Sequence, residues 1–152
     1  MGEVTAKGPN VMLGYLNRPA ETAAVLRDGW FYTGDLGRLD EEGYLTIVDR
    51  KKDMLIVGGL NVYPREVEAV LEAHPAVAEA AVIGVPDPVK GEEPLAFVVR
   101  RPGQAASGQD LLRSLRARLA AFKVPKRIIF LEALPRNATG KVLKHVLKSQ
   151  AG

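Results

Sequence analysis

The sequence predicts a small α+β domain, and three observations lead to this fold class. Short apolar runs typical of strands lie among segments whose apolar residues recur at helical spacing, without the strict alternation of a parallel α/β sheet. The 152-residue chain is 47% hydrophobic, which suffices for a core. No compositional bias indicates disorder. We expect the domain to begin near Leu36 or Val48 and to extend to the end of the chain.

The stretch before this domain, residues 1–37, is dense in Gly, Pro and Asn and shows only short apolar pieces. We expect one short helix there, over residues 19–26, because Pro19 suits the first turn of a helix. We do not expect this stretch to bury a core of its own.

Five strands are expected in the remainder of the chain. A turn at residues 40–43 precedes the first strand, and Gly58-Gly59 ends the second. The polar segment 86–94 should form a loop between the third and the fourth. The expected strands are residues 44–48, 54–57, 80–85, 95–100 and 127–131.

Three helices are expected in the same region. The first begins at Pro64 and ends before Pro75. The second follows a loop at residues 101–108 and carries an apolar stripe at helical spacing, made of Leu111, Leu112, Leu115, Leu119 and Phe122. The third is a short amphipathic helix over residues 142–147, with Lys141 at its start.

The composition excludes several kinds of chemistry. The chain has no Cys, so disulfides, thiolate metal sites and a cysteine nucleophile are all excluded. The two histidines, His74 and His145, stand far apart without ligand spacing around them, which argues against a zinc site. No apolar run is long enough to cross a bilayer, so we expect a cytoplasmic protein without a membrane span.

The net charge of +3 hides an asymmetry along the chain. From residue 108 onward there are ten Lys/Arg and two Asp/Glu (+8), against eleven and sixteen before it (−5). Such a tail favours polyanionic partners such as a nucleotide, coenzyme A or nucleic acid, although a solvated helix face would have the same composition. Nucleic acid is disfavoured, because only 6% of residues are aromatic and could stack on bases.

Lys141 is the first candidate site residue. The amino end of a helix favours negative charge, so helix stability does not explain a lysine there, whereas a bound anion would. The alternative is a lysine that points into water. A phosphate-binding loop is excluded, because Pro135 stands where that motif needs glycine and Val142 where it needs Ser or Thr.

Three further candidates lie upstream. Asp35 follows Gly34, and a carboxylate can accept both hydrogen bonds of a ribose diol. Arg50 offers a planar fork of donors to a ribose oxygen or a phosphate. Gly58-Gly59 would let a ligand pass close to the backbone. The alternatives are an ordinary turn aspartate, a solvated charged turn, and a glycine turn that needs positive φ.

These signals gain weight from their order along the chain. Residues 30–36, 43–68, 122–126 and 135–141 together resemble the C-terminal part of the adenylate-forming (AMP-binding) enzyme superfamily, and within it most nearly the acyl-CoA synthetases. The resemblance covers essentially the whole chain. It implies a ligase that joins a carboxylic acid, such as a fatty acid, to ATP and then transfers the acyl group to coenzyme A, with release of pyrophosphate and AMP.

The resemblance also implies roles for single residues. Asp35 and Arg50 match residues that contact the ribose of ATP or AMP, and Lys52 matches the hinge position. Lys141 matches the lysine that bridges the carboxylate and the α-phosphate during adenylation. Gly58 and Gly59 match the channel for coenzyme A. ATP and coenzyme A would then be substrates, with Mg²⁺ arriving on ATP rather than bound by this chain.

The resemblance implies a division of the chain as well. Residues 1–48 match the tail of an N-terminal adenylation domain, a remnant of its β-subdomain. Residues 49–152 match the mobile C-terminal lid, a short β-hairpin and a three-stranded sheet flanked by helices. We therefore expect a fragment without its large domain, inactive alone and able to form a strand-paired or swapped dimer. The alternative function is a stand-alone polyanion-binding or regulatory module.

Overall fold

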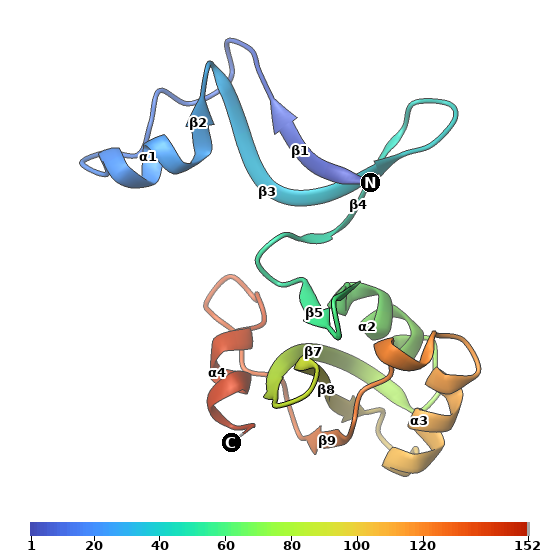
Figure 1. Cartoon of the computed structure of the whole chain (residues 1–152). Coiled ribbons are helices and arrows are strands. Elements are labelled where there is room, and N and C mark those ends of the chain that lie inside the picture. The colour runs from blue at the N-terminus through green and yellow to red at the C-terminus, as the bar shows by residue number, and fades with distance from the viewer. Residues whose placement is uncertain (152) are drawn as a thin grey trace. The chain divides into compact units, whose positions relative to one another are not determined.

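The computed structural model describes residues 1–151 (Figure 1). The chain forms two compact units, Met1–Lys52 and a second unit from Asp53 onward. The division lies four residues after the boundary at residue 48 that the sequence suggested.

The first unit is a four-stranded antiparallel sheet with one short helix. Its long central strand β3 pairs with β1, β2 and β4. Its elements are β1 (Gly2–Ala6), α1 (Pro19–Val25), β2 (Leu26–Arg27), β3 (Trp30–Leu39) and β4 (Leu45–Arg50). The sequence predicted α1 and β4 but missed the other strands, because glycines interrupt β3 and a strand of this kind depends on its partners.

The first unit buries almost no side chains, as the sequence predicted. Among residues 1–52 only Gly37 and Asp49 are buried, while Leu13 and Leu16 are almost fully exposed. The sheet is therefore held mainly by backbone pairing, and its apolar side chains remain available to other surfaces.

The second unit contains a five-stranded sheet and three α-helices. Its elements are β5 (Leu55–Val57), β6 (Leu60–Val62), α2 (Pro64–Glu72), β7 (Val77–Asp87), β8 (Gly91–Arg100), α3 (Gly108–Arg116), the 3₁₀ helix η1 (Ala121–Lys123), β9 (Ile128–Leu131) and α4 (Lys144–Ser149). Strand β8 lies between the antiparallel β7 and the parallel β9, and α3 provides the crossover that parallel pairing requires. The β5–β6 hairpin joins β8 where Val57 pairs with Gly91. The predicted α+β class is confirmed.

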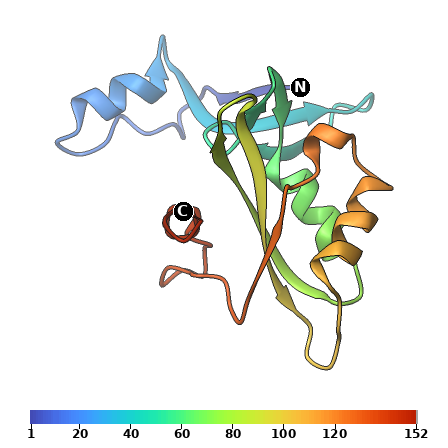
Figure 2. The same cartoon turned by 60° about the horizontal axis from the view of Figure 1, so that its bottom comes forward.

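Helices cover both faces of this sheet, as Figure 2 shows, with α2 and α3 on one side and α4 on the other. Successive residues of β7 alternate between the two faces: Val82 packs in the core with α2 and α3, and Ile83 packs in the core with α4. In β8, Val98 and Phe97 divide in the same way. This two-sided burial explains why both strands are continuous apolar runs.

Two predicted boundaries were wrong. The segment 86–94 is not a long loop, because β7 runs to Asp87 and β8 begins at Gly91, with ladder pairs continuing to the turn. The helix predicted from the apolar stripe ends at Arg116. Leu119 and Phe122 still pack against the same core, from the turn and from η1. The apolar spacing therefore continues past the end of the helix, because these residues also pack against the core.

A capping box stabilises the start of α3. Ser107 and Asp110 form this capping box, and the Ser107 hydroxyl lowers the pKa of the Asp110 carboxyl.

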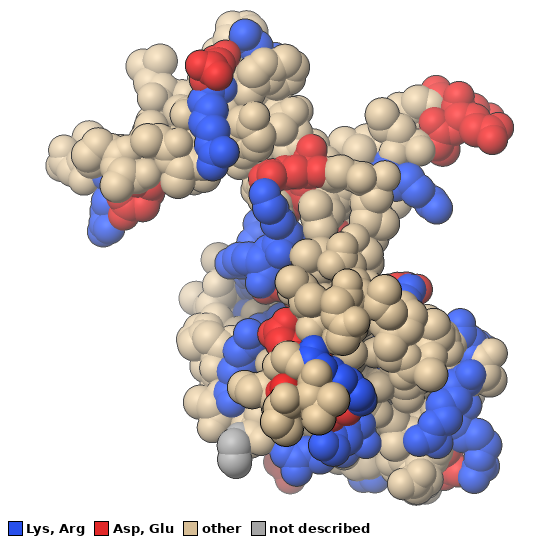
Figure 3. Space-filling model, in the orientation of Figure 1, with Lys and Arg blue, Asp and Glu red and all other residues tan. Residues whose placement is uncertain are grey.

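Charged side chains are unevenly distributed over the surface. Acidic side chains gather over the β3–β4 turn and basic ones over α3 (Figure 3). Of the helices in residues 1–151, none combines the length and apolar character needed to cross a membrane.

Candidate functional site

The predicted site residues divide between the two units. The first unit holds Asp35, Arg50 and Lys52, and the second holds Gly58, Gly59 and Lys141. Each group is described within its own unit. Within residues 1–151 no three His, Asp or Glu side chains gather in a way that could hold a metal ion.

The two residues predicted to contact a ribose are brought together by the pairing of β3 with β4. Asp35 and Arg50 stand directly opposite each other in the ladder. Arg50 Nε donates to Asp35 Oδ1 at 3.2 Å, and both side chains stay partly exposed, at 43% and 32%. The pair therefore offers donors and acceptors side by side on partly exposed side chains, a combination that suits a ribose diol.

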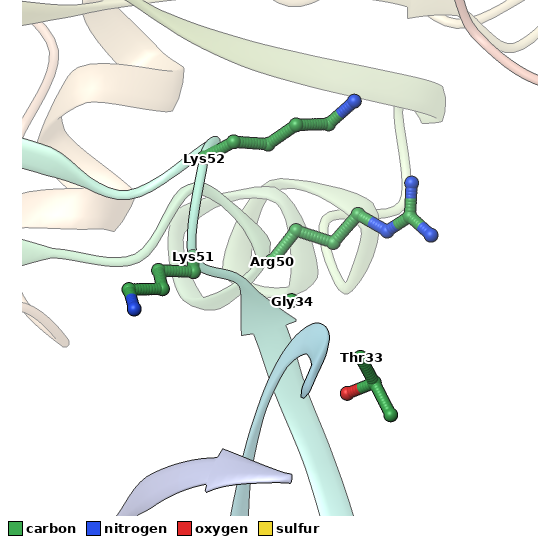
Figure 4. Close-up of a pocket in the computed structure, with 5 residues that line it drawn as sticks. All are labelled: Thr33, Gly34, Arg50, Lys51 and Lys52. Atoms are coloured by element: carbon green, nitrogen blue, oxygen red, sulfur yellow. The ribbon is translucent and has the colours of Figure 1, made fainter. Parts of the chain in front are cut away.

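A hollow of about 360 Å³ lies beside this pair and is lined by Thr33, Gly34, Arg50, Lys51 and Lys52 (Figure 4). Gly34 has φ +75°, and no atom lies within 4 Å of where a Cβ would stand, so the backbone forms an open wall. The predicted glycine bend is thus present, although it lies inside a strand.

The basic side chains of the 49–53 segment point in different directions. Figure 4 shows Arg50 and Lys52 extending one way and Lys51 turning the other way. The Lys51 ammonium donates to Glu3 Oε2 at 2.8 Å, and this hydrogen bond lowers the pKa of Glu3. Lys51 is therefore engaged in holding β1, while Arg50 and Lys52 remain to face a ligand in the hollow.

Gly58 and Gly59 form the two-residue turn between β5 and β6. Both have positive φ, +57° and +81°, and the flanking residues Val57 and Leu60 pair across the hairpin. No atom lies within 4 Å of a Cβ built on either glycine. The turn therefore needs positive φ, as one of the two interpretations predicted, and the passage of a ligand over its open outer side stays a prediction.

Lys141 stands in a closed loop, residues 135–143, which we call the lysine loop. Leu143 N donates to Pro135 O at 2.8 Å, and Asn137 N donates to Lys141 O at 3.0 Å. Between these bonds Arg136 and Val142 form an antiparallel bridge. Helix α4 begins only at Lys144, so the prediction of Lys141 at a helix start was wrong. Val142 pairs with Arg136 instead of starting the helix.

The side chains of Asn137 and Arg136 hold the lysine loop from inside, and Arg136 Nη1 donates to Gly140 O. Asn137 Oδ1 accepts hydrogen bonds from Thr139 N, Thr139 Oγ1 and Lys141 N, at 3.1, 2.8 and 2.8 Å. Gly140 supplies the positive φ of the bend, +82°. The Lys141 side chain is exposed, and its ammonium makes no hydrogen bond or ion pair with the described residues. A fixed backbone thus presents a free charge.

A second hollow, of about 720 Å³, lies in the second unit. The cations Lys126, Arg127 and Lys148 line it together with Val85, Pro86, Glu93 and Ala151. Buried Glu93 accepts from Lys90 at 2.7 Å and lies 3.2 Å from the Lys126 ammonium, and these bonds lower its pKa. The sequence predicted only a basic C-terminal tail. The hollow itself could not be predicted, because residues that line it come from β7, β8 and α4, which only the fold brings together.

Comparison with known proteins identifies what this arrangement is similar to. The family model of the AMP-binding enzyme C-terminal domain matches residues 66–141, half of the chain. The chain is 52% identical over 147 residues to a 2-succinylbenzoate–CoA ligase of Geobacillus sp. (strain WCH70), covering 97% of this chain and 30% of the relative. It is 54% identical over 146 residues to a long-chain-fatty-acid–CoA ligase of Bacillus subtilis (strain 168), covering 96% and 26%.

A solved structure agrees with these relatives. ATP-bound MatB from Rhodopseudomonas palustris superposes with a TM-score of 0.92 at 48% identity, over 98% of this chain and 30% of that one. The chain thus spans less than a third of the length of the proteins it matches. Since the family model covers half of its residues, the chain belongs to the AMP-binding enzyme C-terminal domain family.

Proposed function

We propose that this chain works as the C-terminal part of an ATP-dependent, AMP-forming acid–CoA ligase. Such an enzyme joins a carboxylic acid to ATP, releasing pyrophosphate and leaving an acyl-adenylate. The thiol of coenzyme A then attacks the acyl carbon, and AMP leaves. The CoA-ligase names of the relatives, at 52% and 54% identity over nearly the whole chain, support this proposal.

The observation that carries the proposal is the Asp35–Arg50 pair beside its hollow. A ribose diol donates two hydrogen bonds, which the Asp35 carboxylate can accept, and the Arg50 guanidinium keeps donors for a sugar or phosphate oxygen. Charge-assisted hydrogen bonds of this kind are about twice as strong as neutral ones. We propose that this pair holds the ribose of ATP and of AMP.

Lys141 suits the first half-reaction, and the Gly58-Gly59 turn suits the second. During adenylation a carboxylate and the α-phosphate approach each other, and an unpaired ammonium such as that of Lys141 would offset their repulsion. The open backbone at Gly58-Gly59 would let the thin arm of coenzyme A pass. Lys52 is the last residue of the first unit, which suits a hinge that exchanges these two faces.

The basic hollow of the second unit suits the phosphates of coenzyme A. Three cations, Lys126, Arg127 and Lys148, line it, while Glu93 offsets part of the charge. Coenzyme A carries several phosphate charges at one end, so a cluster of cations would attract that end.

We propose that an adenylation domain supplies the phosphate loop and the acyl pocket, and that these 152 residues alone are inactive. Mg²⁺ would arrive on ATP, and the expected location is the cytoplasm. The similar relatives act on acids as different as 2-succinylbenzoate and long-chain fatty acids. This variety indicates that the acid is selected outside the segment that they share with this chain.

The test is a chimeric ligase, in which this chain replaces the matching segment of the Geobacillus 2-succinylbenzoate–CoA ligase. ATP–pyrophosphate exchange with 2-succinylbenzoate should be restored in the chimeric ligase and absent from the 152-residue chain alone. Asp35→Asn should raise the KM for ATP about tenfold, the effect of weakening a hydrogen bond to a charged group. A folded chimera without exchange, or exchange by the chain alone, would contradict the proposal.

A stand-alone polyanion-binding module is the rival function. It predicts tight binding of an oligonucleotide to the 152-residue chain at physiological salt, measured by fluorescence anisotropy. The ligase proposal predicts weak binding that salt abolishes, because only a few surface cations would contact the phosphates of an oligonucleotide.

A further inference from the structure

Two ion pairs anchor the lysine loop, one on each side of Lys141. Before it, Arg136 Nη2 lies 2.8 Å from Glu79 Oε2, on strand β7. After it, the Lys144 ammonium lies 2.8 Å from Glu68 Oε1, on helix α2. The loop is thereby tied at both ends to elements of the central sheet and its helix layer.

Glu68 is the more deeply placed of the two carboxylates. It is only 6% exposed, although Glu is almost never buried without partners. Besides Lys144 it accepts the backbone N–H of Val82 in β7 at 2.9 Å, and the Arg65 guanidinium lies 3.7 Å away. These partners hold the carboxylate in one position. If it moved away from any of them, a buried charge or a buried N–H donor would be left without a partner.

The Glu68–Lys144 pair joins elements from opposite faces of the sheet. Helix α2 covers one face and α4 the other (Figure 2). Strand β7 is the last strand in the order and pairs only with β8, so the Val82 N–H that Glu68 accepts lies on its unpaired edge. Glu68 therefore reaches the edge of the sheet from α2 and meets Lys144 as it starts α4.

We propose that Glu68 is a positioning residue for Lys141. It holds Lys144, three residues after Lys141, and so fixes the point where the lysine loop leaves for α4. The Lys141 ammonium has no hydrogen-bond or ion-pair partner of its own among the described residues, so the position of its loop sets the region that the charge can reach. This inference rests on the proposed role of Lys141 in adenylation.

The pair with Glu68 matters more than the pair with Glu79. The side chains of Arg136 and Glu79 are 42% and 41% exposed, whereas those of Lys144 and Glu68 are 25% and 8% exposed. Water and salt screen an exposed pair, and such pairs contribute little. Removing one partner of a buried pair leaves an uncompensated charge, so the loop should respond mainly to Glu68.

Adenylation needs the ammonium in place when the negative charges meet. Small displacements of a catalytic group, about 1 Å, can cost roughly 100-fold in rate. Loss of the Glu68 charge would leave the Lys141 side chain and the internal bonds of its loop intact but weaken the attachment of the loop to α2. The defect should therefore appear in kcat of the first half-reaction and not in binding of ATP.

The test uses the chimeric ligase with Glu68→Gln, which keeps an acceptor for Val82 N and removes the attraction for Lys144. We expect kcat of ATP–pyrophosphate exchange to fall at least about tenfold, with the KM for ATP within about twofold. Lys144→Met should behave in the same way, and Lys144→Arg should keep nearly full activity. Thioester formation from isolated acyl-adenylate should stay near the unmodified rate.

Glu72→Gln is the matched control. Glu72 lies on the same helix and binds the same Arg65, at 3.1 Å, but among the described residues no hydrogen bond or ion pair joins it to the lysine loop or to Lys144. Exchange by this variant should stay within about twofold of the unmodified chimeric ligase.

The decisive measurement is the double variant with Lys141→Ala. If Glu68 acts through Lys141, Glu68→Gln should cause no further loss of exchange once Lys141 is gone. An equal fractional loss in both backgrounds, or normal exchange by Glu68→Gln, would overturn the inference. If Glu68→Gln does not fold, Lys144→Met gives the same readout from the more exposed partner. Normal exchange by Lys141→Ala alone would instead overturn the proposed function.

Discussion

At the scale of single residues, Lys141 differs from most other cations of the second unit, because its ammonium has no hydrogen-bond or ion-pair partner within residues 1–151. Lys123 binds Glu66, Lys144 binds Glu68 and Arg136 binds Glu79 within the same unit. The Lys141 backbone is nevertheless fixed, because its N–H is bound by Asn137 and its carbonyl accepts Asn137 N. A fixed backbone under an unpaired charge is the arrangement expected of a group that awaits an anion.

Lys141→Ala should therefore lower adenylation without unfolding the protein. We expect exchange by the chimeric ligase to fall about 10²–10³-fold, the usual loss when one preorganised electrostatic group is removed. The melting temperature should stay unchanged, because the side chain is exposed. Arg118→Ala, which removes another exposed cation, serves as the control and should leave exchange unaltered. An unharmed first half-reaction with slow thioester formation would reverse the assigned role.

At the scale of elements, the β5–β6 hairpin is held to the sheet by few bonds. Gly58 N donates to Lys90 O at 2.9 Å, and Ile56 N donates to Glu92 Oε2 at 2.9 Å. The turn itself depends on the two glycines, because both need φ values that other residues adopt only at a cost. The hairpin is thus anchored at its strands and open at its tip.

Gly59→Ala should separate the two half-reactions. An added Cβ meets no atom of the chain, so the substitution should cost about 1–2 kcal/mol of stability from backbone strain alone. Thioester formation should slow severalfold if coenzyme A passes over this turn, while pyrophosphate exchange stays near normal. Gly103→Ala is a matched control, since Gly103 also has positive φ, +72°, and open space around it. Equal effects of the two variants on thioester formation would remove Gly59 from the channel.

The end of the β7–β8 hairpin should show pH-dependent stability. Lys90 and then Lys126 lower the pKa of Glu93 below its ordinary value of 4.5, and Glu93 raises the pKa of Lys90 above 10.5. The stabilisation is therefore complete between these two values. It is lost as pH falls through the lowered pKa of Glu93, or as pH rises through the raised pKa of Lys90.

Urea unfolding of the 152-residue chain against pH measures this contribution. Glu93→Gln should be less stable than the unmodified chain near pH 7, and the difference should shrink as the pH falls below 4.5 and through the lowered pKa of Glu93. A difference that is independent of pH would assign the effect to packing rather than to charge.

At the scale of the whole molecule, the first unit has sheet edges that pair with no other strand of residues 1–151, and it has exposed apolar side chains. Strand β1 pairs only with β3, and Leu13, Leu16, Tyr44 and Ile47 are exposed. Unpaired edges and exposed apolar surface favour association between copies.

The 152-residue chain should therefore self-associate through its first unit. Sedimentation velocity should detect dimers at micromolar concentration, and a fragment that begins at Asp53 should remain monomeric at the same concentration. A monomeric full chain over the same range would show that the exposed strands are sufficiently protected by their own twist and charges.

Much of the second unit follows from local sequence. Pro64 opens α2 where predicted, Gly58-Gly59 makes the turn, and the apolar runs of β7 and β8 form the central strands. These features depend on the conformational limits of single residues or on spacing within a few residues, so they can be read without knowing the fold. The order of the four motifs along the chain also indicated the family. The family model that matches half of the chain confirms this prediction.

Only the tertiary structure decided which distant residues meet. Asp35 faces Arg50 because β3 and β4 pair, and Glu68 holds Lys144 across 76 positions because α2 and α4 meet at the edge of β7. Local patterns do not carry such information, since strand register and helix docking depend on partners far away in the chain. The sequence by itself determined the glycine bends and the lysine they present, and the packed sheet determined what holds that lysine in place.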